Sequence, residues 1–183
     1  MIGLTAINVQ AVPPPAEQIG ANCAAPVYAS DRLVCDDVEL RAIDTANVRA
    51  SAAFASLPLA NGSLIEANAP WFHRRSLCAF EGEHRACLLE AYGDRALILQ
   101  GALASGGIGR RLRCQGEWSK RALQMTISGN GAILLADAGQ LFAAATPQRP
   151  DAIWQPAVIY QQRGKRFAFE PRGKAAIICH SDS

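Results

Sequence analysis

The stretch Trp71–Arg95, WFHRRSLCAFEGEHRACLLEAYGDR, decides how the first half of the chain folds. Its Trp71, Arg74, Arg75 and Cys78 stand at offsets 0, 3, 4 and 7, which places them on one face of a helix or at its edge. The cysteines of the stretch lack metal-binding spacing, because the chain contains no Cys-x-x-Cys pair. We therefore predict two helices pinned by a disulfide rather than a reactive site.

Helical spacing extends to both sides of this stretch. Over residues 30–57 mainly apolar or small residues recur at intervals of three or four, and Ser30 and Asp36 are candidate N-caps. A second helix is expected to begin near Ala69, and a third to run over residues 86–103. The first half of the chain is therefore predicted to be helical.

The periodicity changes after Gly109. Short runs with partial two-residue alternation follow one another, and the segments SGNGA, DAGQ, RGKR and PRGK are typical of hairpin turns. Five to eight strands in about 70 residues predict a small antiparallel β-barrel, closed so that no edge is exposed. We predict an α+β protein with an N-terminal tether or signal remnant at residues 1–20, a small disulfide-bonded helical domain at 21–103 and the barrel at 110–183.

The composition limits the possible functions. Hydrophobic residues make up 50% of the 183, enough for a buried core, and no apolar run approaches the roughly 20 residues of a transmembrane helix. Residues 21–100 contain 7 Lys or Arg against 10 Asp or Glu, a net of −3, and residues 101–183 contain 11 against 5, a net of +6. The second half could attract phosphate or anionic lipid, but its cations lack interleaved aromatic side chains, so no nucleic-acid partner is expected.

The six cysteines form an even set, which favours three disulfides and an oxidising compartment. Many pairings are possible. We favour those that stay within one predicted domain: Cys23 with Cys35, Cys78 with Cys87, and Cys114 with Cys179. The three histidines show no metal or catalytic motif, and no Ser-His-Asp or paired-carboxylate site is recognisable. We predict no catalysis, no metal and no cofactor.

The N-terminus leaves two explanations open. Val9-Gln10-Ala11 fits the small-residue pattern of a signal-peptidase site, but the apolar stretch before it is short and lacks a basic segment. Either a signal peptide has been trimmed or the match is accidental. The triple proline at 13–15 predicts an extended tether.

Residues Cys23 to Leu97 resemble the LprI-type lysozyme-inhibitor domain of bacterial envelope proteins. The likeness rests on Cys23, VCDDVELRAID around Cys35, Trp71, Arg75, Cys78 and ACLLEAYGDR from Ala86. Asn68 departs from the family, which usually has Gln at this position, and Pro70 is a second departure.

The C-terminal half is similar to the MliC-type inhibitors of c-type lysozyme. It shares their flanking cysteines, here Cys114 and Cys179, and an ending of the same type, YQQRGKRFAFEPRGKAAIIC. Arg163 stands where that family has its inhibitory lysine. The family's Ser/Gly-rich loop should fall near RPDAIWQ, residues 149–155, and its serine is absent there.

The two resemblances imply an exported protein, periplasmic or secreted to the cell envelope, that binds lysozyme and blocks its cleft. Lysozyme-type glycosidases hold two carboxylates beside the scissile bond, and an inserted guanidinium or ammonium ion would pair with them and exclude the sugar. The best carriers are Arg163 and Lys165 around Gly164, with Asp151 and Trp154 as rim contacts.

The target and role have open alternatives. C-type lysozyme is the first expectation, but it is basic and the second half of the chain carries +6, so another peptidoglycan-active enzyme or an anionic envelope polymer is an alternative partner. A non-inhibitory periplasmic adaptor for cell-wall material and an immunity protein against a wall-degrading toxin are the alternative functions.

Overall fold

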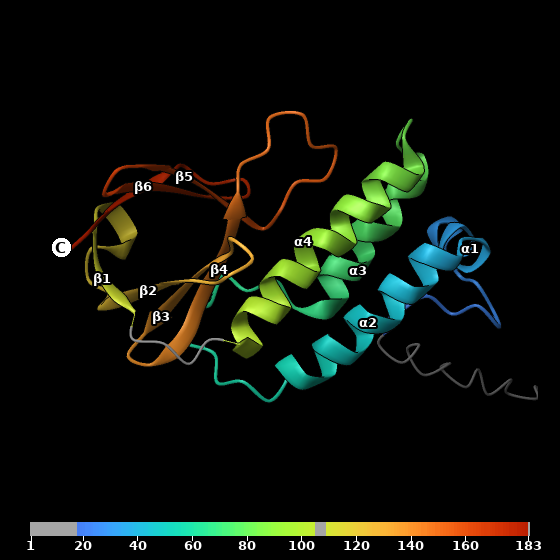
Figure 1. Ribbon diagram of the computed structural model, residues 1–183, viewed down its shortest axis with the longest axis horizontal. Coiled ribbons are helices and arrows are strands. Elements are labelled where there is room, and N and C mark those ends of the chain that lie inside the picture. Colours follow the sequence, from blue (N-terminus) through green and yellow to red (C-terminus); the bar gives the residue numbers. More distant parts are fainter. Residues whose placement is uncertain (1–17, 105–108, 183) are drawn as a thin grey trace, which may run out of the picture.

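The computed structural model describes residues 18–104 and 109–182 and confirms the α+β class (Figure 1). A helical part occupies one end of the molecule and a closed barrel the other. The candidate signal site and the triple proline lie outside the described residues. The helices are α1 (Ala29–Asp36), α2 (Val38–Phe54), α3 (Asn68–Ser76), the 3-10 turn η1 (Leu77–Phe80) and α4 (His84–Ala104). The division into domains at residues 103 and 110 stays a prediction.

The segment 30–57 forms two helices rather than the single one expected. Asp37 interrupts it with an extended backbone and caps α2, because its carboxylate accepts hydrogen bonds from the N–H groups of Glu39 and Leu40 at 2.9 and 3.1 Å. The predicted caps were therefore wrong in detail. Asp36 is the last residue of α1, and Ser30 lies inside α1.

A buried ion pair ties α1 to α3. The side chains of Arg75 and Asp31 are both 0% exposed, and Arg75 Nη1 and Nη2 each lie 3.2 Å from Asp31 Oδ1. Arg75 Nη1 also donates to the Ser30 hydroxyl, and the guanidinium stacks 4.0 Å from the Phe72 ring centroid. A folded protein tolerates charges that are so fully removed from water only when they are paired and hydrogen-bonded in this way.

The strands close a barrel in the order β1-β2-β3-β4-β5-β6-β7, with β7 pairing back to β1. Their bounds are β1 (Arg110–Cys114), β2 (Leu123–Ile127), β3 (Ile133–Asp137), β4 (Gln140–Pro147), β5 (Val158–Arg163), β6 (Arg166–Pro171) and β7 (Ile177–Ser181), with the 3-10 turn η2 (Gly116–Trp118) after β1. The four predicted turn segments all join consecutive antiparallel strands, as expected.

One strand pair departs from the antiparallel pattern. β4 and β5 are parallel, with Thr146 opposite Ile159. The chain leaves β4 through residues 148–157, a crossover toward the helices, and returns to enter β5 in the same direction (Figure 1). This crossover, which we call the strap, is the part of the barrel that reaches the helical part.

The two parts share a hydrophobic core. Ile98, Leu99 and Ala102 of α4 pack with Phe54 of α2 against the outward side chains Leu134 of β3 and Ala144 of β4. The segment after α2 runs along the barrel, where the Ala60 N–H donates to Leu141 O at 2.9 Å. β3 and β4 are therefore buried on both faces, by the barrel core on one side and by helices on the other.

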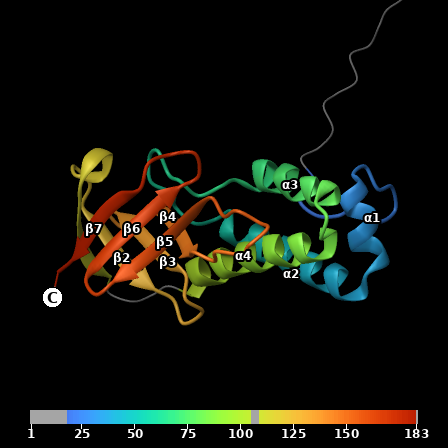
Figure 2. The ribbon, with the colours of Figure 1, turned by 90° about the horizontal axis from the view of Figure 1, so that it is seen from above.

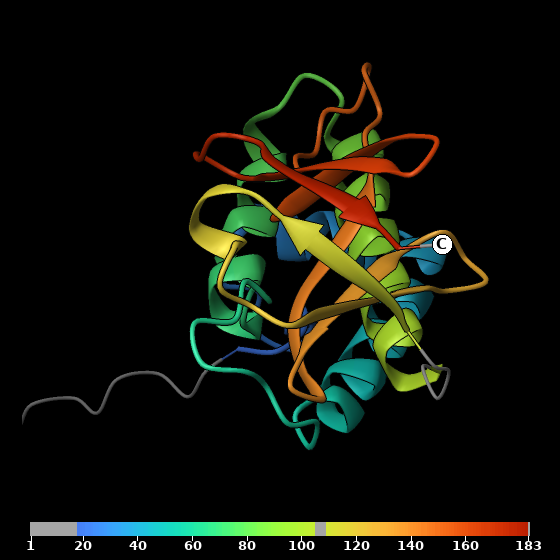
Figure 3. The same cartoon turned by 90° about the vertical axis from the view of Figure 1, so that its left-hand side faces the viewer.

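All three disulfides pair as predicted, Cys23–Cys35, Cys78–Cys87 and Cys114–Cys179. The last pair lies on paired strands and joins β1 to β7, where the barrel closes (Figure 3). Three disulfides indicate an extracytoplasmic protein. In the part of the chain that the structure describes, no helix has the length and apolarity of a membrane span.

Replacing Arg75 by Met should cost about 3–5 kcal/mol of unfolding free energy, because Asp31 would be left as an unpaired buried carboxylate. Urea denaturation measures the loss. Arg85→Met is the control: Arg85 pairs with Asp37 at the surface, where its side chain is 53% exposed, so the loss should be much smaller. Equal losses in the two variants would contradict a stabilising role for the buried pair.

Removing Cys114–Cys179 with a double alanine variant should lower the unfolding free energy by about 4 kcal/mol, because this bridge spans 65 residues. The same change at Cys23–Cys35, which spans 12 residues, should cost about 3 kcal/mol in the same chain-entropy model. Urea titration under non-reducing conditions gives both values, and a larger loss from the shorter bridge would show that loop length does not govern them.

Candidate functional site

The predicted cationic turn is a tight hairpin between β5 and β6. Arg163 pairs directly with Arg166, so the loop contains only Gly164 and Lys165. Gly164 has φ +61°, in the left-handed region that glycine adopts without strain. The Ser181 N–H of β7 donates to Lys165 O at 3.0 Å, which ties the turn to the last strand. All four turn residues are exposed, at the barrel end remote from the helices, the end that faces the viewer in Figure 3.

Four basic residues extend from this turn across the barrel wall. Arg113, His180, Arg166 and Arg163 are successive cross-strand partners on β1, β7, β6 and β5, and all four are exposed. We call them the basic row. Of its three arginines, within the described chain only Arg113 has an ion-pair partner, Asp182, at 3.1 Å. Within the described chain, Arg163 and Arg166 are therefore the two guanidinium groups of the row without an ion-pair partner.

The two predicted rim contacts lie elsewhere. Asp151 and Trp154 belong to the strap, at the opposite end of β5 from the turn, and the six residues of β5 span about 17–20 Å. Asp151 is exposed, but Trp154 is only 4% exposed. The structure thus brings Arg163, Gly164 and Lys165 together and leaves Asp151 and Trp154 apart from them.

Trp154 is an anchor rather than a rim contact, which corrects the expectation from sequence. Its indole packs in the helical core with Trp71 and Tyr92, and the Arg74 guanidinium lies 4.0 Å from its ring centroid. Its backbone N–H donates to Glu90 Oε2 of α4 at 2.8 Å. These contacts hold the strap against α3 and α4, so the indole is not available to a partner.

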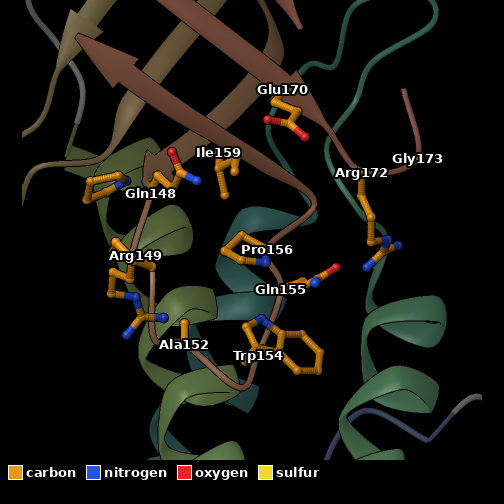
Figure 4. Close-up of a pocket in the computed structure, with 12 residues that line it drawn as sticks. Gln148, Arg149, Ala152, Trp154, Gln155, Pro156, Ile159, Glu170, Arg172 and Gly173 are labelled. Atoms are coloured by element: carbon orange, nitrogen blue, oxygen red, sulfur yellow. The ribbon is translucent and has the colours of Figure 1, made fainter. Parts of the chain in front are cut away.

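A second candidate site, which sequence reasoning missed, lies between the strap and the β6–β7 turn (Figure 4). This pocket measures about 280 Å³. Figure 4 shows Arg149 and Gln155 on the strap side, Pro156 between them, and Glu170 and Arg172 on the β6 side. The pocket exists because the strap folds back over the helices, and no local motif in RPDAIWQ signals that path.

Charged groups beneath this pocket join the two parts. Burial alone would raise the pKa of Glu66, but hydrogen bonds from Arg74 at 2.8 Å and Arg172 at 3.1 Å hold that pKa below its usual range. Arg74 also donates to Gln155 O of the strap at 3.0 Å. Glu66 therefore links α3, the strap and the β6–β7 turn through charge-assisted hydrogen bonds.

Asp94 of α4 differs from the paired charged groups beneath the pocket, since it is buried without an ion pair in the described chain. Burial raises the pKa of Asp94, and the nearby Thr146 hydroxyl and Trp154 indole offset this only in part. A buried carboxyl of this kind favours its neutral form.

Comparison with known proteins assigns no family. No family model matches the chain, and neither a curated protein nor a solved structure matches it. Among the described residues, no group of three or more His, Cys, Asp or Glu side chains is placed to hold a metal ion. The site is therefore assessed on its own geometry.

The raised pKa of Asp94 predicts a pH-dependent stability. A carboxyl whose pKa is higher in the folded state stabilises the fold fully only below its unfolded value, near 3.8, and less as pH rises through the folded pKa. Asp94→Asn should therefore gain stability relative to the wild type as pH rises from about 3.5 to 7. Urea titrations of both proteins across this range measure the difference, and a difference that shrinks with rising pH would contradict the assignment.

Proposed function

We propose that this chain is an exported, non-catalytic binding protein of the bacterial envelope, in the periplasm or at the cell surface, that inhibits lysozyme. In this proposal the Arg163–Lys165 turn enters the substrate cleft and pairs with its two carboxylates. The observation that carries the proposal is the turn itself: a two-residue hairpin that holds exposed cations at the free end of the barrel.

The turn is braced, which lowers the entropic cost of binding. β5 and β6 pair along six residues, Gln162 Nε2 donates to Gly164 O at 3.0 Å, and the Ser181 N–H fixes Lys165 O from the other side. The Cys114–Cys179 bridge closes the barrel beside β6, because Cys179 is the register partner of Phe167. A loop ordered before binding loses less freedom when it enters a cleft.

The charge chemistry supports the same proposal. Cleft carboxylates of a lysozyme-type glycosidase include one that must be protonated to act as the acid. A guanidinium placed beside it would favour the ionised form, so binding would remove the catalytic proton as well as the space for the sugar. The sequence likenesses to LprI-type and MliC-type inhibitors agree with this role, and c-type lysozyme is the first target to test.

A second candidate function rests on the strap pocket. Arg149, Gln155 and Glu170 are exposed there beside the apolar Pro156 and Ile159, a combination suited to a small polar ligand. A non-inhibitory adaptor for cell-wall material would use this pocket and leave lysozyme active. An immunity protein would show inhibition of a wall-degrading toxin instead.

Lysis of a bacterial suspension by c-type lysozyme should slow in the presence of micromolar protein. Arg163→Ala combined with Lys165→Ala should weaken inhibition at least about tenfold, because truncating one partner of a desolvated charge pair costs about 2–5 kcal/mol. The fall in turbidity measures the rate.

The control combines Arg41→Ala with Lys120→Ala, which removes the same charge at two exposed positions away from the turn. This variant should inhibit as the wild type does. Absence of inhibition by the wild-type protein would exclude the proposal for this target and favour the adaptor or immunity role. Equal inhibition by both double variants would move the inhibitory site away from the turn.

A further inference from the structure

The outer wall of the barrel carries a hollow beside the basic row. It measures about 300 Å³ and is lined by Gln161, Arg163, Arg166, Ala168, Ala176 and Ile178. β5, β6 and β7, which supply five of these residues, lie side by side with their outer face toward the viewer in Figure 2. The hollow lies at the opposite end of β5 from the strap and its pocket.

Strand register explains why these side chains converge. Arg163 is the direct partner of Arg166, and Gln161 is the direct partner of Ala168, which in turn faces Ile178. Their neighbours along the strands, such as Phe167, point inward and are buried in the barrel core. Two guanidiniums thus stand over one end of the hollow, and an amide and small apolar side chains form its remainder.

The two guanidiniums lack a carboxylate partner within the described chain. The nearest outward acid along β6, Glu170, is four residues from Arg166, or about 13 Å along the strand. Directly opposed like charges destabilise a strand pair, so Arg163 facing Arg166 costs the fold stability. Arrangements that break a local rule in this way are expected where a ligand compensates.

We propose that the hollow binds a phosphate ester. One carboxylate is occupied fully by one bidentate guanidinium, whereas a phosphate offers enough oxygens to accept from Arg163, Arg166 and the Gln161 amide together. The apolar floor formed by Ala168, Ala176 and Ile178 receives the carbon atoms of the esterified alcohol. Either a lipid headgroup or a free organic phosphate would supply such a phosphate ester.

This site shares Arg163 with the lysozyme-blocking turn, but it differs in requiring Arg166 and Gln161 on the wall of the sheet. Its test contains no lysozyme. Loss of phosphate-ester binding would leave the inhibition result untouched, and absence of inhibition would leave this result untouched.

The first experiment is an amide NMR titration of the whole protein with glycerol phosphate. Saturable shifts should cluster on β5, β6 and β7, with an affinity at least about tenfold tighter than for acetate. Arg166→Gln should weaken binding at least about tenfold, while Arg41→Gln, an exposed arginine on α2, should not. Retained dispersion of the other amide signals shows that the variant is folded.

Several outcomes would overturn the proposal: shifts scattered over all basic side chains, equal affinity for acetate, or equal binding by the two variants. A second arm identifies the source of the ester by co-sedimentation with vesicles of phosphatidylglycerol or of phosphatidylcholine. Sedimentation with phosphatidylglycerol alone, competed by glycerol phosphate and lost in Arg166→Gln, assigns a lipid headgroup. Binding of glycerol phosphate without sedimentation assigns a free ester.

Discussion

The burial of α4 in two hydrophobic cores, that of the helical part and that shared with the barrel, is the constraint on which the rest of the structure depends. Its first half supplies Leu88 and Tyr92 to the helical core, and its second half supplies Leu99 and Ala102 to the core shared with β3 and β4. A helix that must present apolar side chains to both cores has little polar surface along its length. The helical part and the barrel are therefore joined by packing as well as by the linking chain.

This joint also requires paired charges, in addition to the buried Arg75–Asp31 pair within the helical part. Where the strap and the segment after α2 cross the junction, their backbone and side-chain polar groups leave water and need partners. Glu66 accepts hydrogen bonds from Arg74 and Arg172, which joins three chain segments, and the Trp154 ring lies over the Arg74 guanidinium. The junction end of the barrel is thereby occupied, and the free end with the β5–β6 turn is left to face other molecules.

Local chemistry could be predicted from the sequence, and long-range placement could not. The four hairpin turns, the helical phasing and the three disulfides depend on residues close in sequence or on counting, and they were found. The parallel pairing of β4 and β5 was not predicted, because the sequence of the strap is that of an ordinary loop. The burial of Trp154 was not predicted, because it depends on packing against α3 and α4. The run around Leu134 and Ala144 gave only partial alternation because helices cover its outer face. The basic row was missed for a related reason: its four members come from four strands, and Arg113 joins the other three only when β1 pairs with β7.

The distribution of charge separates the two uses proposed for the free end. The barrel half carries +6 and the helical half −3, so the long-range field at the turn is positive. A basic enzyme is repelled by that field until its cleft carboxylates come within a few ångströms, whereas an anionic phosphate ester is attracted throughout its approach. Salt screens the long-range part and spares contacts inside a dry cleft. Added salt should therefore leave the association rate with a basic enzyme unchanged or raise it, whereas it should weaken the binding of a phosphate ester. The two effects differ because the partners carry opposite charge, although both contact the same arginine.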